Sequence, residues 1–195
     1  MKIKTLFASL LLATASFAQT WTFDAAHSSV AFSIKHLAVS TTKGEFDKVD
    51  IKLTGDAKKP TTLAAEVTIQ TASVNTKNEK RDEHLRAADF FDAAQFPTIV
   101  FKSEKVTFKG GKGVMSGTLT MHGVSKKIDI PFTLSGPVED PWKNTRIGLE
   151  GAFKLDRTDY GVSGGVPAVG KEVKIEISSE FLIPAPAAPE APAAK

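Results

Sequence analysis

Hydrophobic and polar residues alternate along most of this chain with a period of two. The pattern is clear at residues 30–35, and it recurs at residues 63–70, 128–134, 147–155 and 173–177. Successive side chains of a β-strand point to opposite faces, so this alternation predicts strands that each have one apolar face. We therefore expect a protein built mainly of β-strands.

Short glycine-containing segments separate the strand-like runs and predict tight turns. They are Gly55-Asp56, Gly110-Gly111, His122-Gly123 and Ser135-Gly136-Pro137. Glycine permits positive φ and proline interrupts strand pairing, so each segment is typical of a turn. Short strands joined by such turns pair in the antiparallel sense.

Strands with one apolar face need a way to bury that face. They can pack as two sheets or close into a barrel, and closure also removes exposed sheet edges. We expect an all-β fold with a short helix, arranged as an antiparallel β-barrel of about eight strands. The alternation does not distinguish a solid barrel from one that holds a ligand.

The segment 77–88 departs from this pattern and predicts the helix. Residues 76–79 read as a capping box, and Asp82 and Arg86 have the i, i+4 spacing of a stabilising pair. The apolar face is thin, with Leu85 as its largest residue, so we place the helix on the rim of the barrel. An aromatic stretch follows before Pro97: Phe90, Phe91 and Phe96.

The two ends of the chain differ from its middle. Residues 1–18 combine Lys2 and Lys4 with an apolar run and a small-residue site at Ala18, which predicts a cleaved signal peptide and export to the periplasm. The run is shorter than the roughly 20 residues of a membrane span, and no later stretch is long and apolar enough to replace it. Residues 184–195 are rich in proline and alanine, which predicts a disordered or polyproline-like tail. One domain, residues 19–183, lies between these ends.

Charge and cysteine content narrow the function classes. Removal of the signal peptide leaves 23 of the 25 basic residues against 22 acidic ones, and the two signs are interleaved. The chain therefore lacks the basic stripe that follows a phosphate backbone, and we expect no nucleic-acid partner. The absence of cysteine excludes disulfides, thiolate chemistry and thiolate metal sites.

The four histidines offer no local metal site, and we expect neither a metal ion nor a cofactor. His84 lies on the predicted helix, where its i±3 and i±4 neighbours are Lys80, Arg81, Ala87 and Ala88. The other three histidines, His27, His36 and His122, lie on or beside strands without ligands two residues away. A site assembled across strands stays open as an alternative.

No nucleophile motif is present. The glycine-rich segment 161–165 lacks the strand and helix of a nucleophile elbow, and we interpret it as a flexible connection, with a lid over an opening as the alternative. The carboxylate pairs at Asp89/Asp92 and Asp156/Asp159 are interpreted as caps and turn acceptors. We therefore expect no catalytic residues.

His36 has the same strand parity as Val30, Phe32 and Ile34. It should point to the apolar side at the end of a strand, where it could donate a hydrogen bond at a barrel mouth. A core histidine with its hydrogen bonds satisfied is the alternative.

These segments together resemble the YceI-like family, from about Trp21 to Ile183. The resemblance rests on several motifs that occur in order and at compatible spacing: Asp24–Ser28 leading into Val30–His36, Lys43–Phe46, Arg81–Leu85, Asp89–Asp92, Phe96-Pro97, Phe101–Ser103, Gly117–Gly123 and Arg157–Gly161. It implies a lipocalin-like barrel exported to the periplasm, with an elongated apolar cavity for a polyisoprenoid chain. The expected ligand-binding residues are Phe32, Ile34, His36, Leu85, Phe90, Phe91, Phe96, Phe101, Leu119, Met121 and Phe153.

We interpret the chain as a periplasmic carrier of a polyisoprenoid or similar long-chain apolar lipid, and not as an enzyme. Two alternatives stay open. One is a hydrolase that acts on a lipid amide or ester through His36 or His84 with a nearby aspartate. The other is a stress-related structural protein with a solid barrel. The sequence also leaves open whether two barrels pair as a homodimer.

Overall fold

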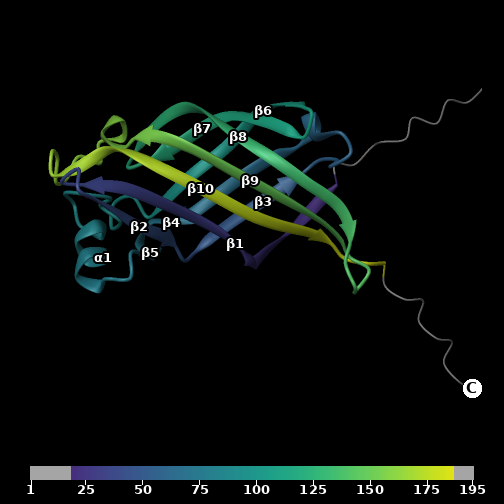
Figure 1. Cartoon of the computed structure of the whole chain (residues 1–195), viewed down its shortest axis with the longest axis horizontal. Coiled ribbons are helices and arrows are strands. Elements are labelled where there is room, and N and C mark those ends of the chain that lie inside the picture. The colour runs from purple at the N-terminus through teal and green to yellow at the C-terminus, as the bar shows by residue number, and fades with distance from the viewer. Residues whose placement is uncertain (1–18, 187–195) are drawn as a thin grey trace, which may run out of the picture.

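Eight antiparallel strands close into a barrel in the computed structural model, which describes residues 19–186 (Figure 1). Pairing of the last strand with the first completes the ring. The barrel strands are β1 (Thr20–His36), β3 (Val49–Thr54), β4 (Ala64–Gln70), β6 (Thr98–Lys109), β7 (Lys112–Met121), β8 (Val124–Glu139), β9 (Thr145–Asp156) and β10 (Val169–Ile183). The predicted all-β barrel of about eight strands is confirmed.

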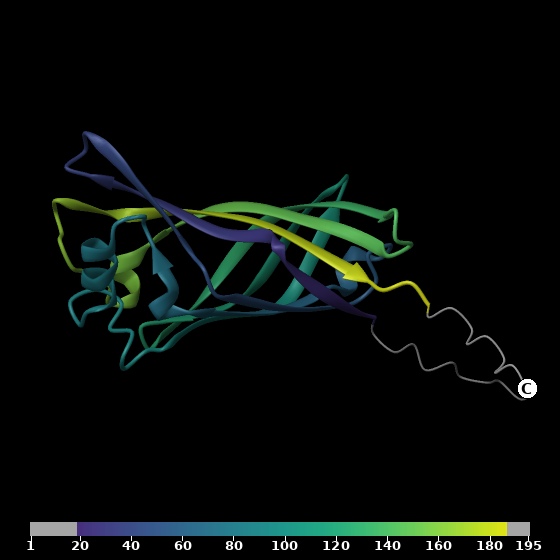
Figure 2. The ribbon, with the colours of Figure 1, turned by 90° about the horizontal axis from the view of Figure 1, so that it is seen from below.

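Strand β1 has different partners at its two ends. Its first residues pair with β3, whereas its last six pair with β2 (Ser40–Phe46). Strand β2 in turn pairs with the two-residue strand β5 (Val74–Asn75). The β1–β2 hairpin therefore extends the wall at the end of the barrel that carries the helix (Figure 2).

The predicted alternation sets which side chains face inward. Val30, Phe32 and Ile34 of β1 face the interior, as do Val173 and Ile175 of β10. The inward residues of β4, β8 and β9 follow the same parity: Val67, Ile69, Ile128, Ile130, Phe153 and Leu155.

Three of the four segments that the sequence predicts as turns do form turns in the structure. Gly55, Gly110, Gly111 and Gly123 all have positive φ at strand ends. The fourth prediction is wrong, because Ser135-Gly136-Pro137 lies inside β8, where the pairing with β9 shifts register. A bulge leaves one residue unpaired, so it tolerates a proline that has no N–H to donate. The β8–β9 connection follows later, at residues 140–144.

Helix α1 (Glu79–Arg86) is shorter than predicted and begins differently. Its N-cap is Asn78, whose side chain accepts a hydrogen bond from the Arg81 N–H, so the predicted capping box is wrong. The predicted Asp82–Arg86 pair does not form either, because Arg86 donates to the carbonyls of Ala72 and Val74. The rim position is confirmed, since α1 lies at one end of the barrel (Figure 1).

The opposite end of the barrel is filled by its own side chains. Leu53 and Phe181 are fully buried there, and Trp21 donates its indole N–H to the Gly55 carbonyl at 3.0 Å. Ile147 and Met115 complete this packing. The barrel is therefore plugged at the end where the described chain begins and ends (Figure 2).

The predicted signal peptide (residues 1–18) and residues 187–195 of the predicted tail lie outside the described residues. Within residues 19–186, no helix is long and apolar enough to cross a membrane.

Candidate functional site

The barrel is hollow between its plug and α1. A cavity of about 410 Å³ occupies the interior, which lies within the range of roughly 300–1,000 Å³ for small-molecule sites. This volume excludes the solid barrel that the sequence left open. Apart from seven residues, every lining side chain is aliphatic, aromatic or Met: Val30, Phe32, Ile34, Phe46, Ile51, Val67, Ile69, Leu85, Phe90, Phe91, Ile99, Phe101, Leu119, Met121, Ile128, Ile130, Phe153, Leu155, Val162, Val169, Val173, Ile175 and Ile177.

The seven other lining residues gather at the α1 end: His36, Thr42, Thr76, Arg81, His84, Arg157 and Gly165. His84 is well exposed, with 61% of its side chain accessible to solvent, and His36 and Arg81 are exposed as well. The cavity therefore opens to solvent at the α1 end, and its polar groups form the mouth.

Arg81 is placed at the mouth by a buried network beneath α1. Its Nε donates to Thr76 Oγ1 at 2.7 Å, and its Nη2 donates to the Thr76 carbonyl at 2.8 Å. Thr76 in turn donates both its N–H and its hydroxyl to Oδ1 of the buried Asp82, at 2.8 and 2.5 Å. The Asp82 carboxylate thus anchors the helix to the chain before it.

Arg157 holds the glycine-rich loop against the mouth. Only 5% of this residue is exposed, and its guanidinium donates to the carbonyls of Val162, Val169 and Gly170 at 2.8, 3.1 and 2.9 Å. Burial lowers the pKa of Arg157, and the nearby Asp156 opposes this effect. Asp156 itself caps the 3-10 turn Arg157–Tyr160, accepting the Thr158 N–H at 2.8 Å, as the sequence predicted.

The glycine-rich loop also packs on Phe90. A Cβ on Gly164 would come within 2.3 Å of the Asp89 carbonyl oxygen and 2.8 Å of the Phe90 ring. The Arg157 guanidinium lies 5.7 Å from the centre of the same ring. The glycine-rich loop is therefore held on both sides by hydrogen bonds from Arg157, and it covers part of the opening.

His84 pairs with an aspartate at the mouth. Its Nε2 lies 2.7 Å from Asp89 Oδ2, and its ring meets the Phe90 ring edge-on, with centroids 4.8 Å apart. Within residues 19–186, neither His84 nor His36 forms a hydrogen bond to a serine or threonine hydroxyl. Among these residues, the partner of His84 is the Asp89 carboxylate.

Ten of the eleven predicted ligand-binding residues line the cavity. Phe96 does not: its ring packs against His122, with centroids 4.5 Å apart, outside the cavity. His36 lines the mouth, so its predicted orientation is correct. The predicted set of ligand-binding residues does not include Arg81, Arg157 or Thr42. Arg81 and Arg157 lie in motifs that carry the family resemblance, and this was the signal available for including them.

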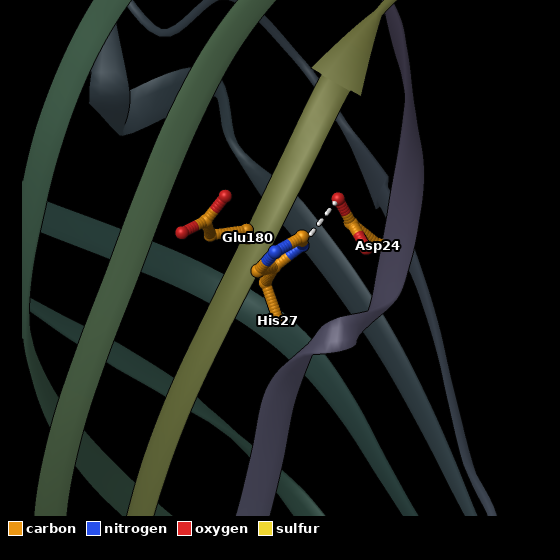
Figure 3. Close-up of side chains that lie close together, drawn as sticks. All are labelled: Asp24, His27 and Glu180. Atoms are coloured by element: carbon orange, nitrogen blue, oxygen red, sulfur yellow. Dashed lines mark hydrogen bonds and ion pairs between the residues drawn. The ribbon is translucent and has the colours of Figure 1, made fainter.

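One cluster away from the cavity resembles a metal site. Asp24, His27 and Glu180 bring potential ligand atoms within 4.8 Å of one another, and His27 Nδ1 lies 3.0 Å from Asp24 Oδ2 (Figure 3). Arg146 Nη1 already lies 2.7 Å from Asp24 Oδ2 and 3.2 Å from Glu180 Oε2. Its hydrogen bond holds the pKa of Asp24 below the ordinary range.

The positive charge of Arg146 repels a cation, so these groups do not fit a metal ion. The cluster instead braces the irregularity in β1, where pairing with β10 shifts register between Asp24 and Ser29. Ser28 completes the brace: its hydroxyl donates to the Asp24 carbonyl and accepts from the Glu180 N–H.

Sequence comparison finds relatives over nearly the whole described chain. A profile of the YceI-like domain matches residues 21–181. The UPF0312 protein SA2479 of Staphylococcus aureus (strain N315) is 39% identical over 171 residues, which cover 84% of this chain and 97% of that protein.

Solved structures share the fold. The YCEI protein of Campylobacter jejuni is 31% identical with a TM-score of 0.70, covering 78% of this chain and 91% of its own. BcnA of Burkholderia cenocepacia has a TM-score of 0.74 at 24% identity, over 81% and 98% of the two chains. A polyisoprenoid binding domain from Saccharophagus degradans has a TM-score of 0.67 at 18% identity, over 86% and 100%. The last two establish similarity of fold alone.

Proposed function

This chain belongs to the YceI-like domain family, and from that premise we propose that it binds a polyisoprenoid or similar long-chain apolar lipid in its barrel and carries it through the periplasm. The cavity is the observation that carries the proposal. It is about 410 Å³ in volume, and its only polar lining lies at the mouth.

Burial of apolar surface supplies the affinity in this proposal. Each Å² of apolar surface removed from water is worth roughly 25 cal/mol, so a long hydrocarbon chain gains affinity along its whole length without any charged contact. The inward residues of the strands offer such a surface, because their branched and aromatic side chains leave no polar atom in the middle of the cavity. The polyisoprenoid binding domain of Saccharophagus degradans, which has the same fold, supports this class of ligand.

Residues 1–18 support the periplasmic location. Two lysines, an apolar run and a small residue at position 18 have the order of a secretory signal peptide. A lipid of this class is almost insoluble in water, so its movement through an aqueous compartment needs a protein that covers it.

We propose a binding protein and not an enzyme. The hydrolase alternative retains one favourable feature, the pairing of His84 with Asp89 at 2.7 Å. Hydrolysis of a long-chain amide or ester that is lost when His84 and His36 are both changed to alanine would support the hydrolase. Turnover that survives both changes would remove that mechanism.

Extraction of bound lipid tests the carrier directly. The protein is purified from the periplasm of its own cells, and its ligand is measured by native mass spectrometry and by organic extraction. We expect a long-chain apolar molecule at up to one per protein. Repeated recovery of ligand-free protein would count against the carrier, and recovery of the unprocessed chain from the cytosol would contradict the location.

A cavity-blocking variant and a matched control sharpen this test. Ile175→Trp places an indole in the cavity and should abolish lipid recovery, whereas Glu176→Trp places the same group on the outer face of β10 and should leave recovery unchanged. Equal lipid recovery from both variants would show that the lipid does not lie in the barrel.

A further inference from the structure

The ionisable groups that line the cavity are all basic. They are two arginines, Arg81 and Arg157, and two histidines, His36 and His84. No lining residue is an aspartate or glutamate, and all of the lining lies within the described residues. All four basic groups lie at the mouth, where the polar end of a bound lipid would rest.

The carboxylates near the mouth interact with groups other than the two lining arginines. Glu45 pairs with Lys77 at 2.7 Å, and Asp89 pairs with His84 at the same distance. Asp82 accepts two hydrogen bonds from Thr76. None of these carboxylates forms an ion pair with either lining arginine.

Arg157 is buried, and its side chain forms no ion pair with a carboxylate of residues 19–186. Its three hydrogen bonds go to neutral backbone carbonyls, and the Asp156 carboxylate beside it accepts from Thr158 instead. A buried charge without a counter-charge is costly, whereas an oxyanion that enters its surroundings forms a strong charge-assisted hydrogen bond. The guanidinium has five N–H groups, so two remain after these three bonds.

Arg81 has a free donor at the same opening. Its Nε and Nη2 donate to Thr76, and its Nη1 has no acceptor among residues 19–186. Because Thr76 already fixes the Arg81 guanidinium in place, ligand binding costs little further side-chain entropy. An anion at the mouth would therefore interact with two guanidinium groups: that of Arg81, which is held in place by Thr76, and that of Arg157, which is buried.

We propose that the carried lipid ends in an oxyanion, a carboxylate or a phosphate, held at the mouth by Arg81 and Arg157. This inference rests on the proposed function, because it concerns the polar end of the same ligand. Such a site distinguishes ligands by their head group, so that a charged acid binds more tightly than the alcohol of equal chain length.

Matched probes test the preference. Dodecanoate, dodecyl phosphate and 1-dodecanol share one chain, and farnesyl phosphate and farnesol repeat the comparison on an isoprenoid. Their affinities for the delipidated full chain are measured at neutral pH by displacement of a fluorescent apolar probe. We expect the oxyanions to bind about tenfold or more tightly than the alcohols, as one or two charge-assisted hydrogen bonds would produce. The two alkyl acids distinguish a carboxylate site from a phosphate site.

Variants of Arg81 assign the effect to this residue. Arg81→Gln should weaken oxyanion binding about tenfold and alcohol binding by much less, so that the preference falls, whereas Arg81→Lys, which keeps the charge, should retain part of the preference. Lys80→Gln is the matched control, because Lys80 is the adjacent cation on α1 and does not line the cavity. It should change neither affinity.

The outcomes separate the two proposals. If alcohols bind as tightly as oxyanions and Arg81→Gln changes nothing, the head-group inference is overturned and the lipid carrier stands. If none of the five probes binds, both are overturned. Loss of the preference in Lys80→Gln to the same extent as in Arg81→Gln would assign it to general charge at the rim and overturn the site.

Discussion

Gly44 lies directly opposite Phe32 in the β1–β2 ladder, and a Cβ on Gly44 would come within 2.4 Å of the Phe32 ring. The ring therefore occupies the space that a side chain at position 44 would fill. From there it packs on Phe46, which contacts Phe91, with centroid distances of 5.7 and 5.9 Å. This aromatic row forms the wall of the cavity below its mouth.

Gly44→Ala should push the Phe32 ring into the cavity. We expect a loss of about 1–3 kcal/mol in the free energy of unfolding, as for other overpacked sites, together with weaker binding of 1-dodecanol. Urea unfolding and probe displacement measure the two effects. Gly148→Ala is the control, because the nearest atom to its Cβ would be 3.8 Å away. Equal effects of the two substitutions would contradict the role of the Phe32 contact.

Acid should break the ion pair between Arg146 and Asp140, whose Nε and Oδ2 atoms lie 2.8 Å apart at the plugged end of the barrel. Burial acts to raise the pKa of Asp140, but hydrogen bonds from Arg146, Asn144 and the Trp142 N–H outweigh it and lower the pKa from 3.8 to about 2. Since the folded state favours the ionised carboxylate, its stabilisation is present above about pH 4 and is lost as pH falls toward 2.

Asp140→Asn should therefore lower Tm at neutral pH, and the difference from the original chain should shrink between pH 4 and 2. Thermal unfolding followed by circular dichroism at several pH values measures this convergence. Asp50→Asn removes an exposed carboxylate that has no ion pair among the described residues, and it should show no such convergence. A constant Tm difference for Asp140→Asn across this range would contradict the assignment.

The β1–β2 turn carries backbone strain at the mouth. Leu37 and Ala38 have φ of 50° and 59°, a conformation that favours glycine or asparagine. Ala38→Gly should raise the free energy of unfolding by about 0.5–1 kcal/mol, because relief of strain exceeds the added entropy of the unfolded chain. Ala31→Gly, in the extended part of β1, should lower it by a similar amount. Chemical denaturation measures both, and destabilisation by Ala38→Gly would contradict the prediction.

Arg157→Lys should loosen the glycine-rich loop. Lysine cannot reach the carbonyls of Val162, Val169 and Gly170 together, and each buried carbonyl left without a donor costs about 1–3 kcal/mol. We expect faster amide hydrogen exchange across residues 161–170 and unchanged exchange in β6 and β7. Arg146→Lys, at the other end of the barrel, is the control and should leave loop exchange unchanged.

The barrel could be predicted from the sequence because its cause is local. Alternation at Val30–Ile34 fixes which side chains face inward, and it also restricts the register, because a shift of one residue would turn the apolar face to solvent. Seven of the ten predicted residues that line the cavity lie on strands and follow this alternation: Phe32, Ile34, His36, Phe101, Leu119, Met121 and Phe153. Strand alternation does not place the four predicted residues on the helix or the irregular segment after it: Leu85, Phe90, Phe91 and Phe96. Three of these residues line the cavity, whereas Phe96 packs against His122 outside it.

Other differences arise where one sequence signal fits two structures. Gly136-Pro137 suits a turn and a bulge equally, and only the partner strand decides between them. Thr76 and Asn78 can both cap a helix. Thr76 does not cap this one, because its hydroxyl donates a hydrogen bond to the Asp82 carboxylate. The charge arrangement at the mouth could not be predicted either, because Arg81 and Arg157 are far apart in the sequence and come to line one cavity only when the barrel closes.

The barrel is closed at one end by Leu53, Trp21 and Phe181, and its cavity opens at the other end, beside α1. A long molecule inside it must leave by reversing along the path it entered, so the end that goes in first comes out last. A donor and an acceptor would have to use the same rim and could not do so at once. In the proposed carrier, loading and release would therefore be two separate binding events, unlike transfer through a channel that contacts two membranes at once.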